Sequence, residues 1–209
     1  MTPAHVKIVQ HPLVARDLAV IREGATPSAA FRQRMRRLAW HLTFEATRAL
    51  PTSPVAVETP LEAMSIEIPS QPAVAVPILR AGLGLLDGFL DVYEDAQVVH
   101  LGYFRDEEAH TPVRYYGTIP ADIAVARVFV LDPMLATGGT VCAALDELKA
   151  AGAQHLSVLA LVSAPEGCDA VAKNHPGTPI FTAALDRGLN DQAYIVPGLG
   201  DAGDRLYNT

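Results

Sequence analysis

The spacing of apolar positions along the chain changes near residue 72. Before that point, large apolar residues recur every three or four positions, at Phe31, Met35, Leu38 and Leu42. This period predicts a helix that buries one face in a core. Ser28 can cap the start of this helix, and Pro51 and Pro54 follow as residues that stop it. We therefore expect residues 1–50 to be mostly helical.

After residue 72, short apolar runs alternate with glycine-bearing turns and helical stretches. The pattern predicts strands at residues 73–76, 97–103, 125–131, 155–162 and 179–183, with helices at 82–90 and 139–151. Strands separated by helices form sheets that are covered on both faces, so we predict an α/β fold with a central, mainly parallel sheet flanked by helices. Ligands bind such sheets at the carboxyl ends of the strands. Chemistry is therefore expected in the loops after residues 76, 103 and 131.

Residues 103–120 break this alternation, because they are polar and aromatic and have no clear period. A loop of this length in a compact domain is often a lid or a binding loop. An excursion into solvent or a two-stranded flap explains the same pattern equally well. The sequence leaves these alternatives open.

Composition limits the classes of protein to consider. The chain has 209 residues, half of them hydrophobic, which suits one globular domain over residues 1–209 with an N-terminal helical segment at about 1–50. The net charge of −7 disfavours nucleic-acid binding, which depends on cationic contacts with phosphates. Residues 1–10 lack the pattern of a signal peptide, and no apolar run approaches the roughly 18 residues that span a membrane. We expect a cytoplasmic protein without a membrane partner.

The cysteines and the densest basic cluster suggest no further site. Cys142 and Cys168 form no CxxC pair, so the sequence predicts neither a zinc site nor a disulfide framework. Both are expected to be buried or half-buried, in a protein of a reducing compartment. The basic cluster consists of Arg32, Arg34, Arg36 and Arg37. We interpret it as the solvated face of a helix.

A loop between a predicted strand and a predicted helix has the composition of a phosphate site. Its residues are Asp132, Pro133, Met134, Leu135, Ala136, Thr137, Gly138, Gly139 and Thr140. The glycines allow backbone N–H groups to face an anion, the start of the helix adds further donors, and the threonines add hydroxyl groups. The loop has no lysine, so it is not a Walker A loop.

Asp132 follows the predicted strand and has no basic neighbour in sequence. A carboxylate at this position can accept hydrogen bonds from the two adjacent hydroxyl groups of a ribose. A diol acceptor beside a phosphate loop suggests that the ligand contains ribose 5-phosphate. An ordinary strand-to-helix turn, with the aspartate as a cap, is the alternative.

A second glycine-bearing loop follows the strand predicted at residues 73–76. Its sequence is Pro77-Ile78-Leu79-Arg80-Ala81-Gly82-Leu83-Gly84. A guanidinium group such as that of Arg80 can bind a pyrophosphate through two parallel hydrogen bonds. An ion pair at the surface is the alternative for this arginine.

The phosphate loop resembles the motif with which phosphoribosyltransferases bind 5-phospho-α-D-ribose 1-diphosphate (PRPP). Most of these enzymes have a second acidic residue where this chain has Pro133, and the proline is typical of the uracil-specific branch. The resemblance covers essentially the whole chain, through segments 11–14, 42–47, 77–84, 112–116, 164–167 and 194–205. It implies a type I phosphoribosyltransferase fold with a base-binding hood at about 185–209 and a flexible flap.

The resemblance also implies roles for individual residues. The implied PRPP-binding residues are Arg80, Arg105, Asp201 and each residue from Asp132 to Thr140. The implied uracil-binding residues are Ile195, Gly200, Asp201 and Ala202. Asp201 and Arg105 are the implied catalytic residues, acting by charge stabilisation, and no general base is assigned. The family often has a lysine near Thr118, which this chain lacks, so the chemistry of the flap stays open.

The glycine-rich C-terminal segment suits uracil chemically. Uracil presents an acceptor, a donor and an acceptor along one edge, and backbone groups of a glycine-rich loop can reach that edge directly. Cytosine lacks the N3 proton, so a carbonyl aimed there would be left unpaired at a cost of about 1–3 kcal/mol. Without the resemblance, a turn or a calcium-binding loop would explain this segment, although its spacing does not fit an EF-hand.

The implied reaction converts uracil and PRPP to UMP and diphosphate, as in pyrimidine salvage. Mg²⁺ is the implied cofactor, held mainly by PRPP and water. The family further implies a homodimer or larger assembly and, in some members, activation by GTP. Two other functions are open from the sequence: an RNA-binding regulator that senses UMP, which the charge of −7 disfavours, and a transferase for another base.

Overall fold

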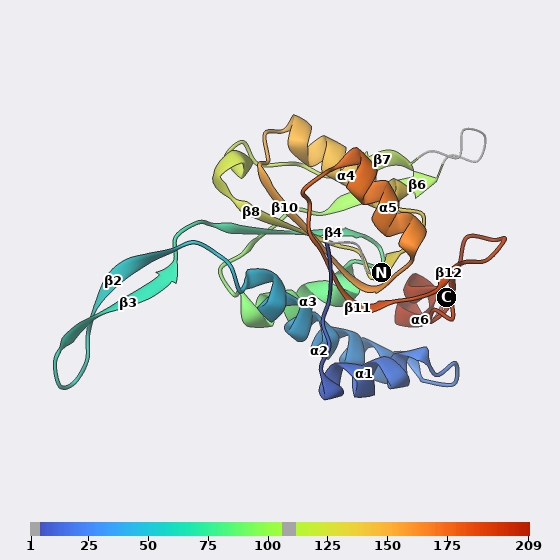
Figure 1. Cartoon of the computed structure of the whole chain (residues 1–209), viewed down its shortest axis with the longest axis horizontal. Helices are drawn as coiled ribbons and strands as arrows, with labels where there is room; N and C mark the ends of the chain where they lie inside the picture. The colour runs from blue at the N-terminus through green and yellow to red at the C-terminus, as the bar shows by residue number, and fades with distance from the viewer. Residues whose placement is uncertain (1–4, 106–111) are drawn as a thin grey trace.

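The computed structural model describes residues 5–105 and 112–209, and a sheet of nine strands forms its centre (Figure 1). The strand order is β1-β11-β10-β8-β4-β6-β7, with β5 paired to β4 and β9 paired to β10. The strands are β1 (Val6–Ile8), β4 (Ala73–Leu79), β5 (Gln97–Val98), β6 (Leu101–Arg105), β7 (Pro112–Tyr116), β8 (Arg127–Leu131), β9 (Met134–Leu135), β10 (His155–Ser163) and β11 (Ile180–Leu185). Every pairing is parallel except that of β6 with β7. The prediction of a mainly parallel sheet is confirmed.

Helices cover both faces of this sheet. They are α1 (Pro12–Arg22), α2 (Ser28–Thr47), α3 (Leu83–Val92), α4 (Gly139–Ala150), α5 (Pro165–Asn174), α6 (Ala202–Tyr207) and a short 3-10 helix (Ile123–Val125). In Figure 1, α4 and α5 lie on one face, and α1, α2 and α3 lie on the other. Among the described residues, no helix combines the length and the apolar character needed to cross a membrane.

Two hydrophobic cores follow from the alternation of side chains along the strands. Phe129 and Leu131 of β8 point into the core shared with α2 and α3, whereas Val128 and Val130 point into the core shared with α4 and α5. All four side chains are almost fully buried. Full burial of one such side chain contributes about 1.5–3 kcal/mol, so the central strands hold the loops at their ends in a fixed arrangement.

The bounds of several elements differ from the prediction. Segment 97–103 is predicted as one strand but forms β5 and β6, because β5 pairs beside Val74 and Ala75 while β6 pairs beside Ile78 and Leu79. The strand predicted from residue 125 begins at Arg127, after the 3-10 helix. The N-terminal segment is also not wholly helical, since residues 6–8 form β1 against β11.

The cap expected at Ser28 is wrong. Helix α2 begins at Ser28 itself, after Pro27 in an extended conformation, and no side chain caps its first turn. The helix ends at Thr47, before Pro51 is reached, and Pro54 lies within a strand of a hairpin.

That hairpin, β2 (Thr52–Glu58) and β3 (Ala63–Pro69), projects from the body of the molecule (Figure 1) and was not predicted. Its register places Val55 opposite Ile66 and Val57 opposite Met64, which makes one face apolar. These four side chains are 39–48% exposed. In β3 the apolar residues Met64, Ile66 and Ile68 alternate with the polar residues Ser65 and Glu67, so the period of two that indicates a strand is present in the sequence and was overlooked.

The arginine cluster on α2 does more than face solvent. Arg34 and Arg37 each lie 3.2 Å from a carboxylate oxygen of Asp17, a residue of α1 that is fully buried. Arg36 binds the Asp91 carboxylate of α3 through two hydrogen bonds of 2.6 Å. The interpretation as a solvated face holds for Arg32 and Arg36, which are exposed, but it is incomplete. Arg34, Arg36 and Arg37 also compensate carboxylates on neighbouring helices.

The flap and the cysteines follow the sequence more closely. Strands β6 and β7 pair antiparallel, so a two-stranded flap is the alternative that forms within residues 103–120. Its residues 106–111 lie outside the described part of the chain. Cys142 and Cys168 are buried and free, as expected.

Candidate active site

The phosphate loop leaves the sheet at the carboxyl end of β8. Strand β9 holds Met134 and Leu135 beside β10, and Gly138 then precedes α4 with a φ of +80°. A Cβ atom at Gly138 would lie 2.9 Å from the Gly167 carbonyl oxygen of α5, so glycine is needed both for its conformation and for its close approach. A cavity of about 100 Å³ is lined by Asp132, Met134, Leu135, Ala136, Thr137, Gly138, Gly139, Thr140 and Val141.

Asp132 and Pro133 fix the start of this loop. The Pro133 carbonyl accepts hydrogen bonds of 3.1 Å from the N–H groups of Leu161 and Val162. The Met134 N–H donates to the Asp132 carboxylate at 3.4 Å, and within the described residues no basic side chain pairs with this carboxylate. Burial raises the pKa of Asp132 to about 6, and the Met134 N–H opposes this shift. The carboxylate thus lacks a strong partner and can accept further donors.

The second predicted loop lies directly beside the first. A Cβ atom at Gly82 would lie 2.4 Å from the Leu131 carbonyl oxygen at the end of β8. Arg80 points towards α6, where its guanidinium group lies 3.8 Å from Asp204 and 5.7 Å from the centre of the Tyr207 ring. The Tyr207 hydroxyl donates to the Arg80 carbonyl oxygen at 3.2 Å. The ion pair with Asp204 is long and exposed, so it contributes little and leaves Arg80 able to bind an anion.

The C-terminal segment forms a third wall. Strand β12 (Gly188–Leu189) pairs antiparallel with β13 (Ile195–Val196), which contains the buried Ile195. Gly198 and Gly200 then adopt positive φ angles of +61° and +80°. The Asp201 carboxylate accepts a 2.9 Å hydrogen bond from the Asp204 N–H and so caps α6, whose first residue is Ala202.

Side chains of Arg22, Asp186 and Arg205 hold this segment in place. The Asp186 carboxylate accepts hydrogen bonds from both terminal nitrogens of Arg22, at 2.9 and 2.7 Å, and from the Gly198 N–H at 2.8 Å. Arg205 donates to the carbonyl oxygens of Ile21, Leu199 and Glu23. Helix α1 thereby anchors the loop that contains Gly198 and Gly200.

Helix α5 links the phosphate loop to the C-terminal segment. Its Gly167 packs against Gly138, as described above, and its neighbour Glu166 accepts a 3.1 Å hydrogen bond from the Leu189 N–H in β12. The loops that contain Arg80 and Asp132 and the C-terminal segment therefore meet at the carboxyl edge of the sheet. Sequence reasoning missed Arg22 and Asp186, and it placed Glu166 in a matching segment without a role, because their partners are distant in sequence.

The flap stands at the same edge. Arg105 ends β6, which lies next to β4 in the sheet, and its side chain lies outside the described part of the structure. The Tyr103 hydroxyl donates to the Glu147 carboxylate of α4 at 2.8 Å, and Arg114 of β7 forms an ion pair with the same carboxylate. Both strands of the flap are thus attached to the helix that follows the phosphate loop.

Comparison with known proteins decides the family. The family model described as "Uracil phosphoribosyltransferase" matches residues 8–209. The chain belongs to the uracil phosphoribosyltransferase family. A uracil phosphoribosyltransferase of Salinibacter ruber is 47% identical over 205 residues, covering 98% of this chain and 98% of the relative. One of Thermoanaerobacter sp. (strain X514) is 45% identical over 206 residues, again covering 98% of each.

A solved structure has the same fold as this chain. A protein of Aquifex aeolicus superposes with a TM-score of 0.91 at 35% identity and covers 97% of both chains. A hypoxanthine-guanine phosphoribosyltransferase of Bacillus anthracis, 10% identical in sequence, superposes with a TM-score of 0.52 over 76% of this chain and shows the fold alone. The type I phosphoribosyltransferase fold expected from the sequence is thus confirmed, and the family model confirms the predicted family.

Proposed function

We propose that this uracil phosphoribosyltransferase converts uracil and PRPP to UMP and diphosphate. One observation carries the proposal: the phosphate loop with its under-partnered Asp132 and the glycine-bearing segment around Gly200 meet at one edge of the sheet. Such an edge can hold a sugar phosphate on one side and a flat base on the other.

The sugar and its phosphates are assigned to the two loops. The N–H groups and hydroxyls from Ala136 to Thr140 bind the 5′-phosphate, and Pro133, Met134 and Leu135 hold that loop against β10. Asp132 accepts hydrogen bonds from both ribose hydroxyls. Arg80 and Arg105 bind the pyrophosphate group, whose negative charge grows as it leaves.

The base is assigned to the C-terminal hood. Backbone groups of Ile195, Gly200 and Ala202 face the edge of uracil, and the two positive-φ glycines make this approach sterically accessible. Asp201 borders both substrates and acts with Arg105 by stabilising charge, and its other role is to cap α6. The N1 atom of uracil attacks C1 of the ribose while the C1–oxygen bond to diphosphate breaks. That step leaves positive charge on the sugar ring and requires chiefly position and electrostatics.

Mg²⁺ fits this site as a substrate-bound ion. Among the described residues, no cluster of three or more His, Cys, Asp or Glu side chains could hold a metal. Mg²⁺ prefers oxygen ligands and retains several waters, so PRPP oxygens and water would supply most of its ligands. When bound, it neutralises the charge of the diphosphate. The exposed carboxylate of Asp201 is the protein group we place nearest to it.

We extend the proposal to assembly, regulation and location. The apolar face of the β2–β3 hairpin and the exposed Trp40 and Phe44 of α2 support a homodimer or larger homo-oligomer, because surfaces of this kind are normally covered. GTP is proposed as an activator on the family resemblance alone. The two free cysteines support a reducing compartment such as the cytoplasm.

A panel of bases tests the reaction. The purified protein is given PRPP and Mg²⁺ with uracil, cytosine, hypoxanthine or orotate, with and without GTP, and diphosphate release is followed. We expect uracil to exceed every other base in kcat/KM by at least about fivefold, since one mismatched hydrogen bond costs about 1–3 kcal/mol. Equal rates with cytosine or another base would contradict the proposed substrate.

A further inference from the structure

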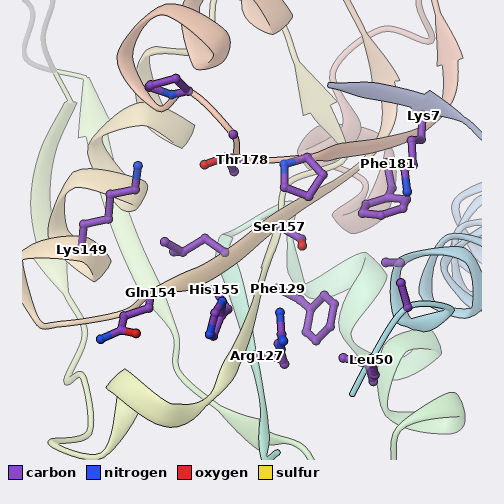
Figure 2. A pocket seen from close by; sticks show the side chains of 16 residues that line it. Lys7, Leu50, Arg127, Phe129, Lys149, Gln154, His155, Ser157, Thr178 and Phe181 are labelled. Carbon is purple, nitrogen blue, oxygen red and sulfur yellow. The ribbon is translucent and has the colours of Figure 1, made fainter. Parts of the chain in front are cut away.

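A second cavity lies at the opposite edge of the sheet from the phosphate loop (Figure 2). It is formed where strands begin, since Arg127 is the first residue of β8 and His155 is the first residue of β10. Its volume is about 340 Å³, within the roughly 300–1,000 Å³ typical of small-molecule sites. It shares no lining residue with the cavity of the phosphate loop. A ligand here would therefore not compete for the proposed PRPP site.

The lining of this cavity is basic and contains no acidic residue. Its basic residues are Lys7, Arg127, Lys149 and His155. Two of the three lysines in the chain are among them, in a protein whose net charge is −7. In Figure 2, Lys149 lies at one end of the hollow and Lys7 at the other, with Arg127 between them. Positive charge is thus concentrated around one hollow in an otherwise acidic chain.

Lys7, Arg127 and Lys149 form no ion pair with an acidic side chain within the described residues. The Lys7 ammonium lies 5.1 Å from the centre of the Phe181 ring, and Arg127 donates to the side-chain amide oxygen of Gln71 at 2.5 Å. The Lys149 ammonium lies 3.1 Å from Nδ1 of His175, whose pKa is lowered by burial and by Lys149 itself. Lys7, Arg127 and Lys149 are therefore not neutralised by a direct ion pair, and an anionic ligand would gain from all three charges.

Other lining groups suit the organic part of such an anion. Ser157 and Thr178 contribute hydroxyl groups, and Phe129, Phe181 and Leu50 contribute apolar surface. Going beyond the proposed function, we infer that this cavity binds a phosphorylated organic anion of about the size of a nucleoside monophosphate. The phosphate contacts the cations and hydroxyls, and the flat organic part covers the apolar surface.

Calorimetric titration with AMP, inorganic phosphate and adenosine tests this inference. Wild-type protein is expected to bind AMP in a saturable 1:1 manner, phosphate more weakly and adenosine not measurably. The double variant Lys7→Gln/Lys149→Gln should raise the Kd for AMP at least about tenfold, and added salt should weaken binding to the wild type by screening. Arg127→Gln is a second, independent variant with the same expected direction.

Matched controls locate the binding. Lys173→Gln/Arg48→Gln removes the same charge at exposed positions outside the cavity, and Asp132→Asn alters the phosphate loop, so both should retain AMP binding. Uracil transfer by the Lys7→Gln/Lys149→Gln variant should persist, which separates this inference from the proposed reaction. The inference is overturned if the wild type does not bind AMP, or if it binds adenosine as tightly as AMP. It is also overturned if the cavity variants bind AMP as tightly as the wild type, or if Asp132→Asn is the only variant that loses AMP binding.

Discussion

The clearest test of the hood concerns Asp186, a residue that would not touch either substrate. Its carboxylate is 7% exposed and joins Arg22 of α1 to the N–H of Gly198. In Asp186→Asn the side chain keeps its shape but has only one oxygen. Its amide NH₂ group then faces an N–H group of Arg22 or Gly198, and two donors cannot form a hydrogen bond with each other. The loop that contains Gly198 and Gly200 is expected to lose its fixed position relative to α1.

The size of the effect follows from the geometry. A hydrogen bond to a charged group contributes about 1.5–3 kcal/mol, and the 25% exposure of Arg22 places this pair at about 1.5–2 kcal/mol because solvent screens it. Since about 1.4 kcal/mol corresponds to a factor of ten, we expect kcat/KM for uracil to fall about ten- to thirtyfold. The loss should lie mainly in KM for uracil, and KM for PRPP should change less than about twofold.

Steady-state kinetics with each substrate varied in turn measures this split. Asp91→Asn is the matched control, because the Asp91 carboxylate also accepts three hydrogen bonds, from Arg36 and Trp40, and lies on α3 away from the hood. These donors lower the pKa of Asp91 to about 2. The control should leave both KM values unchanged. The reasoning is refuted if Asp186→Asn keeps its KM for uracil within about twofold of wild type, or if KM for PRPP rises by the same factor.

Three further predictions concern the loop, the hood and the hairpin. Because the raised pKa of Asp132 is about 6, its carboxylate becomes protonated below that pH. The value of kcat/KM for PRPP should therefore fall as the pH decreases through about 6, and this pH dependence should be absent in Asp132→Asn. Asp201→Ala and Asp201→Asn should both abolish turnover, although only the alanine variant loses the cap of α6, which stabilises the helix by about 0.5–2 kcal/mol. Near-wild-type activity of either variant, with a normal far-UV CD spectrum, contradicts the role assigned to Asp201. Ile66→Lys should shift the protein towards monomer in sedimentation velocity, and an unchanged distribution would remove the hairpin from the proposed interface.

The fold was predictable from the sequence where burial leaves a plain pattern, either the helical period of α2 or an unbroken apolar run in a central strand. Strands β4, β8, β10 and β11 are apolar runs because both faces of a central parallel strand are buried. The β2–β3 hairpin was overlooked although Met64, Ile66 and Ile68 alternate with Ser65 and Glu67; the sequence signals the strand, but not that the hairpin projects from the body with both faces exposed. Ser28 was predicted as the cap of α2 but is the first residue of the helix. These two positions are adjacent in sequence, and only the backbone conformation distinguishes them.

The phosphate loop could be proposed from the sequence itself, because its proposed role depends on neighbouring residues: a strand end at Asp132, a glycine with positive φ at Gly138, and the start of α4. The contacts that hold the neighbouring segments in place around this loop are decided only by the tertiary structure. Asp186 meets Arg22 across 164 positions, and Tyr207 meets Arg80 across 127. Such partners share no local pattern, since they are brought together only when helices pack on the sheet. The basic cavity at the opposite edge arises in the same way, from strands and loops that are separate in sequence.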